Sequence, residues 1–463
     1  MVITSRNVIS GGVRDVISEH TIKGDVITGE IRRERTNMEL IDKVLNGNNV
    51  VDATKKVLAN KGACGVDGIT IEKFKEDWKN NLINFEEIKE RIKSRKYIPQ
   101  PVLRARIPKE NGTMRDLGIP VIMDRIIQQA IVQVLSPMYE EQFSDNSYGF
   151  RPGRSCEQAI TKLLELFNDG YVWVVDIDLE KFFDNVCHDK LISLIMKTVH
   201  DGELVSLIRK YLKAGVMDKG VFQETTKGTP QGGNLSPLLS NIMLNELDKE
   251  LDKRGLKYVR YADDTVIVVK SEKAANRVMS SIVKYIEKKL GLKVNATKTR
   301  IAKPNQIKYL GFGFYYTKGG KIKPKPHLKS IEKFKRKLKQ LTERSWSISL
   351  DDRLTKINAV IRGWVNYFKI TDMKSLMASI GEWLRHRLRT IIWKYWKIPM
   401  ARYNALVKLG ISKENAYEVA NTSKGYFWVA KTVILHIAIS NKRLEQRGLI
   451  LPEKHYNKVH ITI

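Results

Sequence analysis

Two short runs of apolar residues near the middle of the chain meet at a pair of acids. Residues 256–261 and 265–270 are rich in Val, Ile and Tyr, which favour a pleated strand, and Asp263-Asp264 interrupts them. The pattern predicts two antiparallel strands with both acids at the turn. Adjacent carboxylates repel each other, so the pair is either a polar hairpin turn or a site where a cation such as a metal ion rests.

A second apolar run also ends in acid. Residues 171–178 read YVWVVDID, and their density of Val predicts a buried central strand that ends at Asp178. A lone Asp at a strand end is usually a cap or a turn residue. Asp178 is also well placed to face the acids of a neighbouring hairpin, so the two acidic strand ends are candidates for one site.

Before and after these strands, apolar residues recur at the three- and four-residue spacing of a helix. This spacing predicts helices over residues 38–60, 74–97, 124–138, 238–251 and 274–290. Ser155-x-x-Gln158 reads as a capping box that opens a further helix. The order strand, helix, hairpin, helix, strand through residues 171–315 predicts an α+β sheet covered by helices on one face.

Two loops carry candidate binding chemistry. Asn111-Gly112 is a strong hairpin signal, and Lys109 and Arg115 flank it, so both side chains can point to one place. This hairpin suits a phosphate clamp, and a solvated hairpin explains the same residues equally well. In residues 227–233, KGTPQGG, the glycines let the backbone approach a ligand closely.

The charge of the chain is large and uneven. Lys and Arg number 81 against 51 Asp and Glu, a formal net charge of +30. Residues 319–463 hold 30 basic and 10 acidic residues, so +20 of this excess lies in the last third. Apolar stripes predict basic helices there, and Lys329, Lys333, Arg336 and Lys337 cover the polar face of the first. Such asymmetry favours nucleic acid as partner over a merely solvated surface.

Other classes of protein are disfavoured by the composition. The 3 Cys residues are far apart and form no CxxC pair, which argues against a zinc ribbon or a disulfide framework. No apolar run approaches the roughly 20 residues of a membrane span, and the N-terminus lacks the pattern of a secretion signal. We therefore expect a cytoplasmic protein without a membrane partner.

Taken together, the ordered motifs resemble those of group II intron-encoded reverse transcriptases/maturases, in the compact bacterial form without an HNH endonuclease domain. The resemblance covers about residues 40–460. It rests on RIPKENGTMRDLGIP, SYGFRPGRS, VDIDLEKFFDNV, GTPQGGNLSPLLSNIMLNELD, RYADD, GLKVNATKT, YLGF and IRGWVNYF.

The resemblance implies a fold and a division into domains. The expected fold is an α+β right-hand polymerase, with fingers and palm built on antiparallel sheet, followed by an α-helical thumb and a small C-terminal DNA-binding domain. Fingers and palm would take residues 37–318, the thumb with maturase domain X residues 319–396, and the DNA-binding domain residues 397–463. Residues 1–36 match nothing in the family and form an extension without an assigned role.

It also implies roles for single residues. Asp178, Asp263 and Asp264 would be catalytic and, with the carbonyl of Leu179, would bind two Mg²⁺ ions, with Mn²⁺ as an alternative. Contacts to the incoming dNTP would come from Lys109, Arg115, Phe183, Gln231 and Lys298, with Phe183 rejecting the ribose 2′-OH. Contacts to nucleic acid would come from Leu310 and Gly311 of the primer grip and from Lys329, Lys333, Arg336 and Lys337.

The implied function is that of an RNA-directed DNA polymerase that extends a primer by two-metal-ion nucleotidyl transfer. It would also bind its intron RNA to assist splicing and target-primed retrohoming. The implied partners are an RNA template, a DNA or RNA primer, dNTPs, intron RNA and target DNA. Two alternatives stay open: a non-enzymatic RNA-binding splicing factor on a polymerase scaffold, and a reverse transcriptase recruited to a CRISPR-associated or other host role.

Overall fold

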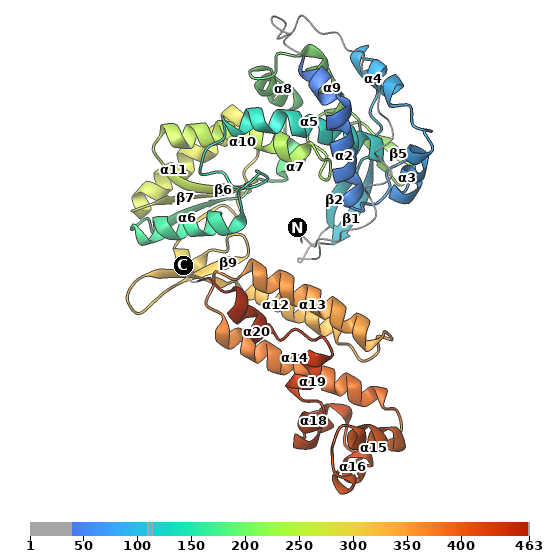
Figure 1. Cartoon of the computed structure of the whole chain (residues 1–463). Coiled ribbons are helices and arrows are strands. Elements are labelled where there is room, and N and C mark those ends of the chain that lie inside the picture. The colour runs from blue at the N-terminus through green and yellow to red at the C-terminus, as the bar shows by residue number, and fades with distance from the viewer. Residues whose placement is uncertain (1–38, 109–111, 113, 462–463) are drawn as a thin grey trace, which may run out of the picture.

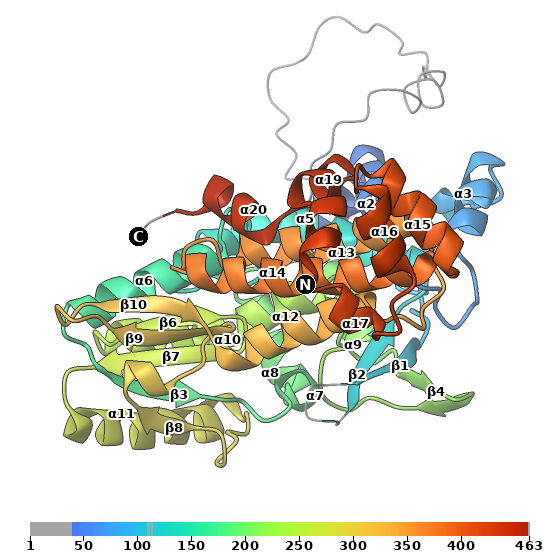
Figure 2. The same cartoon turned by 90° about the horizontal axis from the view of Figure 1, so that it is seen from below.

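The structure is a computed structural model that describes residues 39–108, 112 and 114–461. The extension at residues 1–36 and Lys109 of the basic hairpin lie outside the described residues. No helix in the described part of the chain has the length and apolarity needed to cross a membrane. Figures 1 and 2 show a sheet-containing body joined to a long set of helices.

The first part of the body is mainly helical. Its elements are α1 (Leu40–Val44), α2 (Gly47–Ala59), α3 (Ile71–Lys79), α4 (Phe85–Lys93) and α5 (Ile122–Glu140). The continuous helix expected over residues 74–97 was wrong, because the chain breaks between α3 and α4. Asn81 has a left-handed φ of 54°, and the side chain of Asn84 caps α4 by accepting from Glu87 N–H. Asn favours such local bonds over helix continuation.

A four-stranded sheet in the order β2-β1-β4-β5 lies beside these helices. The predicted basic hairpin is confirmed as the antiparallel pair β1 (Val102–Pro108) and β2 (Met114–Ile119). Its parallel neighbour β4 (Val216–Asp218) pairs in turn with β5 (Val221–Gln223).

The central sheet has the order β6-β7-β3-β8, and all its pairs are antiparallel. Its strands are β3 (Trp173–Ile177), β6 (Lys257–Tyr261), β7 (Asp264–Val269) and β8 (Arg300–Ala302). The predicted central strand and acidic hairpin are therefore both confirmed. Short helices follow β3, namely α7 (Phe182–Asn185), α8 (His188–Met196) and α9 (Gly202–Leu212).

Both faces of the central sheet are buried, so the expectation of helices on one face was wrong. Val175 and Ile267 share a core with α10 (Ser236–Lys253) and α11 (Glu272–Tyr285). Val174 and Val268 share another core with α6 (Cys156–Asn168) on the opposite face. β3 and β7 are apolar at successive positions rather than alternate ones, and such strands require cover on both sides. The predicted capping box at Ser155 and Gln158 opens α6.

A two-stranded sheet of β9 (Phe312–Tyr316) and β10 (Ile322–Pro326) follows. The helices after it, from α12 to α20 over residues 328–459, form what we call the helical arm. Three long helices follow, α12 (Leu328–Leu341), α13 (Leu350–Tyr367) and α14 (Lys374–Tyr395). The apolar stripe expected on the first of them buries Phe334 and Leu338.

Short helices complete the chain. They are α15 (Pro399–Lys408), α16 (Lys413–Ala420), α17 (Tyr426–Val429), α18 (Val433–Ala438), α19 (Asn441–Gln446) and α20 (Pro452–Val459). α15, α16 and α18 lie at the far end of the arm, whereas α20 returns to pack on α13 and α14 (Figure 1). The last segment therefore shares packing with the long helices, and the boundary at residue 397 stays a prediction.

Candidate functional site

A cavity of about 880 Å³ lies between the β1–β2 hairpin, the end of β3 and the β6–β7 turn. It brings together every predicted metal and dNTP residue that falls within the described part of the chain. These lining residues are Arg115, Asp178, Leu179, Phe183, Gln231, Asp263, Asp264 and Lys298. Residues far apart in sequence thus share one concave site, which is the arrangement that a substrate pocket requires.

The acidic turn reaches this cavity through a tight hairpin. Tyr261 pairs with Asp264 across β6 and β7, which leaves Ala262 and Asp263 as the turn itself. Ala262 has a φ of +56°, a left-handed conformation that a residue with a Cβ rarely adopts. The hairpin is therefore held in a strained form at the point where it presents Asp263.

Burial and neighbouring acids raise the pKa values of three carboxyl groups in and beside the cavity, those of Asp264, Asp263 and Asp176. Burial, followed by the charges of Asp263, Asp176 and Asp178, raises the pKa of Asp264 to about 7. Burial also raises the pKa of Asp263, against the guanidinium of Arg115, which lowers it. Asp176 of β3, two residues before the predicted acid Asp178, has its pKa raised to about 6 by burial first and then by the charge of Asp178. The site is thus a concentration of negative charge that a cation would relieve.

Lys298 supplies one such positive charge. Its Nζ lies 3.2 Å and 3.1 Å from the two carboxylate oxygens of Asp178. The backbone around Asp178 is also held, because its N–H donates to the Thr299 hydroxyl and its carbonyl accepts from Asn295 N–H. The predicted strand-end acid is therefore anchored to the segment that carries Lys298.

The oxygen-only donor set suits a hard divalent cation such as Mg²⁺. As the side chains stand, no three acidic, His or Cys residues among those described converge closely enough to hold a metal ion. Asp178 instead holds Lys298 as its cation in this structure.

The opposite wall of the cavity joins the basic hairpin to the Gly-rich loop. Arg115 Nε donates to Gln231 Oε1 at 2.9 Å, and Gly118 N–H donates to the Gln231 carbonyl at 2.7 Å. Gly232, next in the loop, has a φ of +121°, and a Cβ there would lie 2.6 Å from the carbonyl oxygen of Gly118. The loop needs glycine to lie this close to β2.

Phe183 forms the floor between these two walls. It is buried on α7 and meets Phe182 edge to face at a ring distance of 5.2 Å. Its carbonyl accepts a hydrogen bond from Thr229 N–H of the Gly-rich loop. Its ring therefore packs on Phe182 and its backbone is held by the Gly-rich loop, while Phe182, 2% exposed, is the more deeply buried of the pair.

The predicted primer-grip residues lie between the acidic hairpin and the helical arm. The Tyr309 hydroxyl donates to the carbonyl of Asp264, and the Tyr367 hydroxyl of α13 donates to the carbonyl of Leu310. Gly311 accepts from the Ser330 hydroxyl of α12. These bonds connect the two regions through one short segment. The predicted nucleic-acid contacts Lys329, Lys333, Arg336 and Lys337 are all exposed on α12.

Comparison with known proteins places this architecture in a family. Residues 107–314 match the family described as reverse transcriptase (RNA-dependent DNA polymerase), and residues 331–410 match the group II intron maturase-specific domain. The protein YkfC of Escherichia coli is 35% identical, over 55% of this chain and 77% of YkfC. The chain belongs to the group II intron reverse transcriptase/maturase family. Its enzyme class is RNA-directed DNA polymerase, and the expected fold class is confirmed.

Other relatives of this reverse transcriptase are intron proteins. The group II intron-encoded protein LtrA of Lactococcus lactis is 33% identical, over 58% of this chain and 55% of LtrA. The chain thus spans about half of the length of LtrA.

Among solved structures, a Cas6-RT-Cas1–Cas2 complex is 23% identical, over 61% of this chain and 47% of that one, with a TM-score of 0.34. This structural score is too low to bear on function.

The sequence patterns did not predict what supports the acidic turn of the reverse transcriptase. Asp176 shares the charge of the cavity, and Arg260, Asp248 and Asn241 form a buried polar cluster behind the turn. One signal was present: Arg260 interrupts an apolar strand, and a charged residue in such a strand requires a buried partner. Nothing in the spacing identified Asp248 as that partner.

Gly149 of the SYGF motif lies directly against the acidic turn. A Cβ at this position would lie 2.2 Å from Ala262 N and 2.8 Å from the Tyr261 carbonyl carbon. Both are backbone atoms, so neither can turn aside. Only glycine fits at position 149, because any side chain there would overlap the backbone of the acidic turn.

We expect Gly149→Ala to lower the rate of primer extension by about a hundredfold, because displacing a catalytic group by about 1 Å has an effect of that size. The measurement is steady-state DNA synthesis by folded protein at equal concentration. Gly319→Ala is the matched control, since a Cβ there meets nothing within 4 Å. A normal rate for Gly149→Ala would show that the turn tolerates displacement.

Proposed function

We propose that this chain copies an RNA template into cDNA from a primer 3′-OH, with Asp178, Asp263 and Asp264 as its catalytic acids. The observation that carries the proposal is the single cavity that joins these acids to Arg115, Gln231 and Phe183. The reaction joins a primer hydroxyl group to a nucleoside triphosphate, so it needs acids that can hold cations and a basic group that can bind the triphosphate. The cavity has both, on facing walls.

The cations proposed for this site are two Mg²⁺ ions, or Mn²⁺ in their place. Asp178, Asp263, Asp264 and the carbonyl of Leu179 would hold them. When bound, such ions lower the pKa of a hydroxyl nucleophile and neutralise charge that develops on phosphate oxygens. Burial first, and then repulsion from Asp263, Asp176 and Asp178, raises the pKa of Asp264 to about 7, and bound cations would offset that repulsion.

The remaining cavity residues would place the nucleotide. Arg115, together with Lys109, would bind the triphosphate through charge-assisted hydrogen bonds. Gln231, held by Arg115, would lie over the nascent base pair. Lys298 would be freed from Asp178 when the acids bind metal, and its ammonium would then be available to the leaving pyrophosphate.

Phe183 would exclude ribonucleotides by contact with a 2′-OH. We expect Phe183→Ala to raise the efficiency of rNTP incorporation relative to dNTP by about tenfold or more, because a single steric contact is worth about 1–3 kcal/mol. The measurement is kcat/KM for dCTP and rCTP on one primer–template. Phe222→Ala is the control, since Phe222 is an exposed aromatic residue of β5 that does not line the cavity, and it should leave the ratio unchanged. An unchanged ratio in Phe183→Ala would refute the role of Phe183.

Primer extension tests the proposed polymerase directly. The purified chain is incubated with poly(rA)/oligo(dT), dTTP and Mg²⁺, and Asp263→Asn serves as the blank. Synthesis above the blank supports the enzyme, and synthesis equal to the blank favours a splicing factor that retains the fold without the activity.

A second role, assistance to splicing and retrohoming, is favoured by the maturase-specific match over residues 331–410. Residues 319–396 would act as the thumb and bind intron RNA and the template–primer duplex, and residues 397–463 would contact target DNA. Splicing of the intron RNA that flanks the gene, measured with and without the protein, tests this role. A gene without such RNA would favour a reverse transcriptase recruited to another host role.

A further inference from the structure

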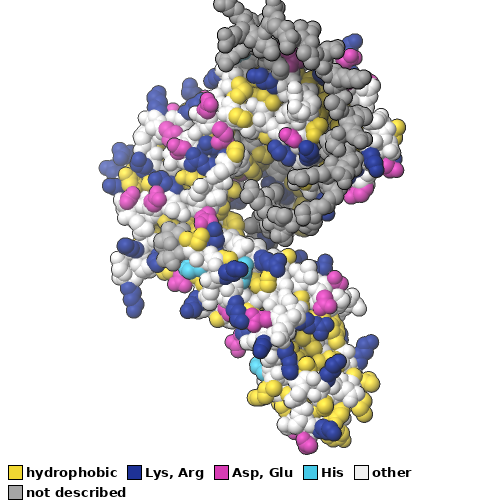
Figure 3. Space-filling view, in the orientation of Figure 1, with side chains coloured by type: hydrophobic (Ala, Val, Ile, Leu, Met, Phe, Trp, Pro, Cys, Tyr) yellow, Lys and Arg dark blue, Asp and Glu magenta, His cyan; other side chains and the backbone are white. Residues whose placement is uncertain are grey.

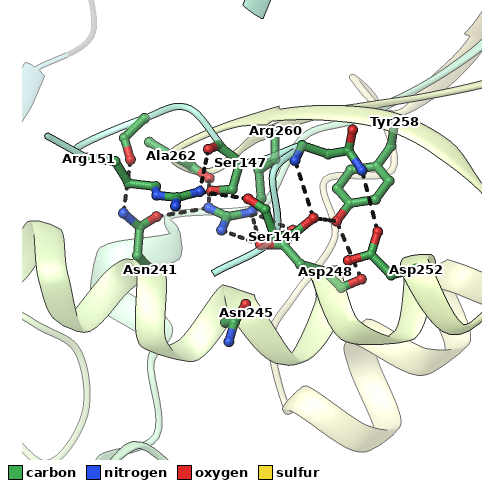
Figure 4. Close-up of polar contacts among 12 residues, drawn as sticks. Ser144, Ser147, Arg151, Asn241, Asn245, Asp248, Asp252, Tyr258, Arg260 and Ala262 are labelled. Atoms are coloured by element: carbon green, nitrogen blue, oxygen red, sulfur yellow. Dashed lines mark hydrogen bonds and ion pairs between the residues drawn. The ribbon is translucent and has the colours of Figure 1, made fainter. Parts of the chain in front are cut away.

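Arg260 is a buried cation directly behind the acidic turn. Its side chain and that of Asp248 on α10 are both 0% exposed. The guanidinium Nε donates to the Asp248 carboxylate, at 2.8 Å from Oδ1 and 3.0 Å from Oδ2. Nη1 donates to Asn241 Oδ1 at 3.0 Å and to the carbonyl oxygen of Ala262 at 2.9 Å. Figure 4 shows these groups meeting above α10.

The bond to Ala262 links Arg260 to the candidate catalytic acid. Ala262 immediately precedes Asp263, and its φ of +56° is a left-handed conformation that a residue with a side chain rarely adopts. A strained conformation persists only where its surroundings enforce it. Arg260 fixes the carbonyl side of Ala262, and Gly149 leaves room on its amide side. The direction of Asp263 is therefore set by both neighbours.

The backbone of Arg260 is held as firmly as its side chain. Arg260 N–H donates to the Asn146 carbonyl, and Tyr148 N–H donates to the Arg260 carbonyl, each at 2.9 Å. Asn241 Nδ2 donates to the carbonyl of Gly149. Arg260 is thus the point where the SYGF segment, α10 and the acidic hairpin meet, with its backbone bonded to the first and its guanidinium to the other two.

Stability alone is a weak explanation for this ion pair. Removing two charges from water is costly, and well-packed apolar side chains of similar size often stabilise a core as well or better. An apolar side chain cannot, however, hold a carbonyl oxygen in a fixed direction. The hydrogen bond from Nη1 to Ala262, made while the same guanidinium binds Asp248 and Asn241, is the feature that an apolar pair would lose.

We propose that Arg260 is a positioning residue for nucleotidyl transfer, which fixes the Ala262 carbonyl and so aims Asp263 into the cavity. The inference rests on the proposed catalytic role of Asp263. Arg260 does not line the cavity, so its effect is on the geometry of the acid and not on the binding of nucleotide or duplex.

Arg260→Lys separates charge from geometry. A lysine keeps a cation beside Asp248, but its compact ammonium cannot reproduce the planar fork that reaches Asp248, Asn241 and Ala262 together. We expect kcat for primer extension to fall by about ten- to a hundredfold, while the KM for dNTP and the Kd for a primer–template duplex stay unchanged.

Tyr258→Phe is the matched control. Tyr258 is equally buried, and its hydroxyl donates to Ser144 Oγ and to the carbonyl of Asp248 in the same network, but it does not contact Ala262. We expect this variant to lose thermal stability while keeping the wild-type kcat. Equal losses of kcat in the two variants would show that Arg260 acts only through folding.

The double variant Arg260→Met/Asp248→Leu covers the case in which Arg260→Lys does not fold. It replaces the pair by apolar side chains, so we expect a folded protein with kcat lowered as in Arg260→Lys. Wild-type kcat in either folded variant overturns the proposal. An inactive wild type would instead refute the proposed polymerase, which distinguishes the two failures.

Discussion

Asp263→Asn is expected to lower the rate of DNA synthesis by about a thousandfold, because it removes transition-state stabilisation of several kcal/mol from a metal-holding acid. The substitution keeps the size of the side chain and the hairpin geometry. Single-turnover extension with saturating dNTP and Mg²⁺ measures the chemical step. A rate within tenfold of wild type would remove Asp263 from the catalytic acids.

Two further measurements separate this loss from misfolding. Asp263 is one of the charges that raise the pKa of Asp264, so its removal relieves repulsion and should not lower the thermal midpoint without metal. Mg²⁺ should raise the midpoint of the wild type, as any ligand of the folded state does, and should do so less in the variant. Asp52→Asn is the control: Asp52 lies on α2, 64% exposed and paired with Lys55, and both rate and midpoint should stay unchanged.

The affinity for a primer–template duplex is expected to fall by about a thousandfold between about 50 and 200 mM salt, as for proteins that neutralise about 6–10 phosphates. The physical reason is the basic last third of the chain, including the exposed cations of α12. Figure 3 shows Lys and Arg side chains along the helical arm. Fluorescence anisotropy at fixed Mg²⁺ and increasing KCl gives the slope of log K against log salt.

Single lysines refine this test. Lys329→Gln and Lys337→Gln should each weaken binding and reduce the slope by about 1, the effect of losing one phosphate contact. Lys55→Gln is the matched control, because Lys55 is 59% exposed on α2, away from the arm. A flat salt dependence of the wild type would exclude an electrostatic origin for binding. A slope reduced equally by Lys55→Gln would place the contact surface elsewhere.

The sequence predicted most of the elements around the site, because their signals are local. The antiparallel pairing of β1 with β2, the capping box at Ser155 and the turn at Asp263 each depend on residues a few positions apart, and all three are found. The break between α3 and α4 was missed, since apolar spacing continues through it and only Asn81 and Asn84 mark it. The cover on both faces of the central sheet was missed because it depends on where distant helices pack.

Within the site, the sequence by itself determined the kinds of group present: paired acids, a basic hairpin, a Gly-rich loop and a basic last third. Only the tertiary structure decided which of them meet. It pairs Lys298 with Asp178, places Gln231 on Arg115, and supports the acidic turn with Gly149 and the buried Arg260–Asp248 pair. The spacing of residues along the chain limits only which side chains lie close together within one helix or hairpin. These contacts join separate elements, so the distances between their atoms depend on how the hydrophobic cores pack.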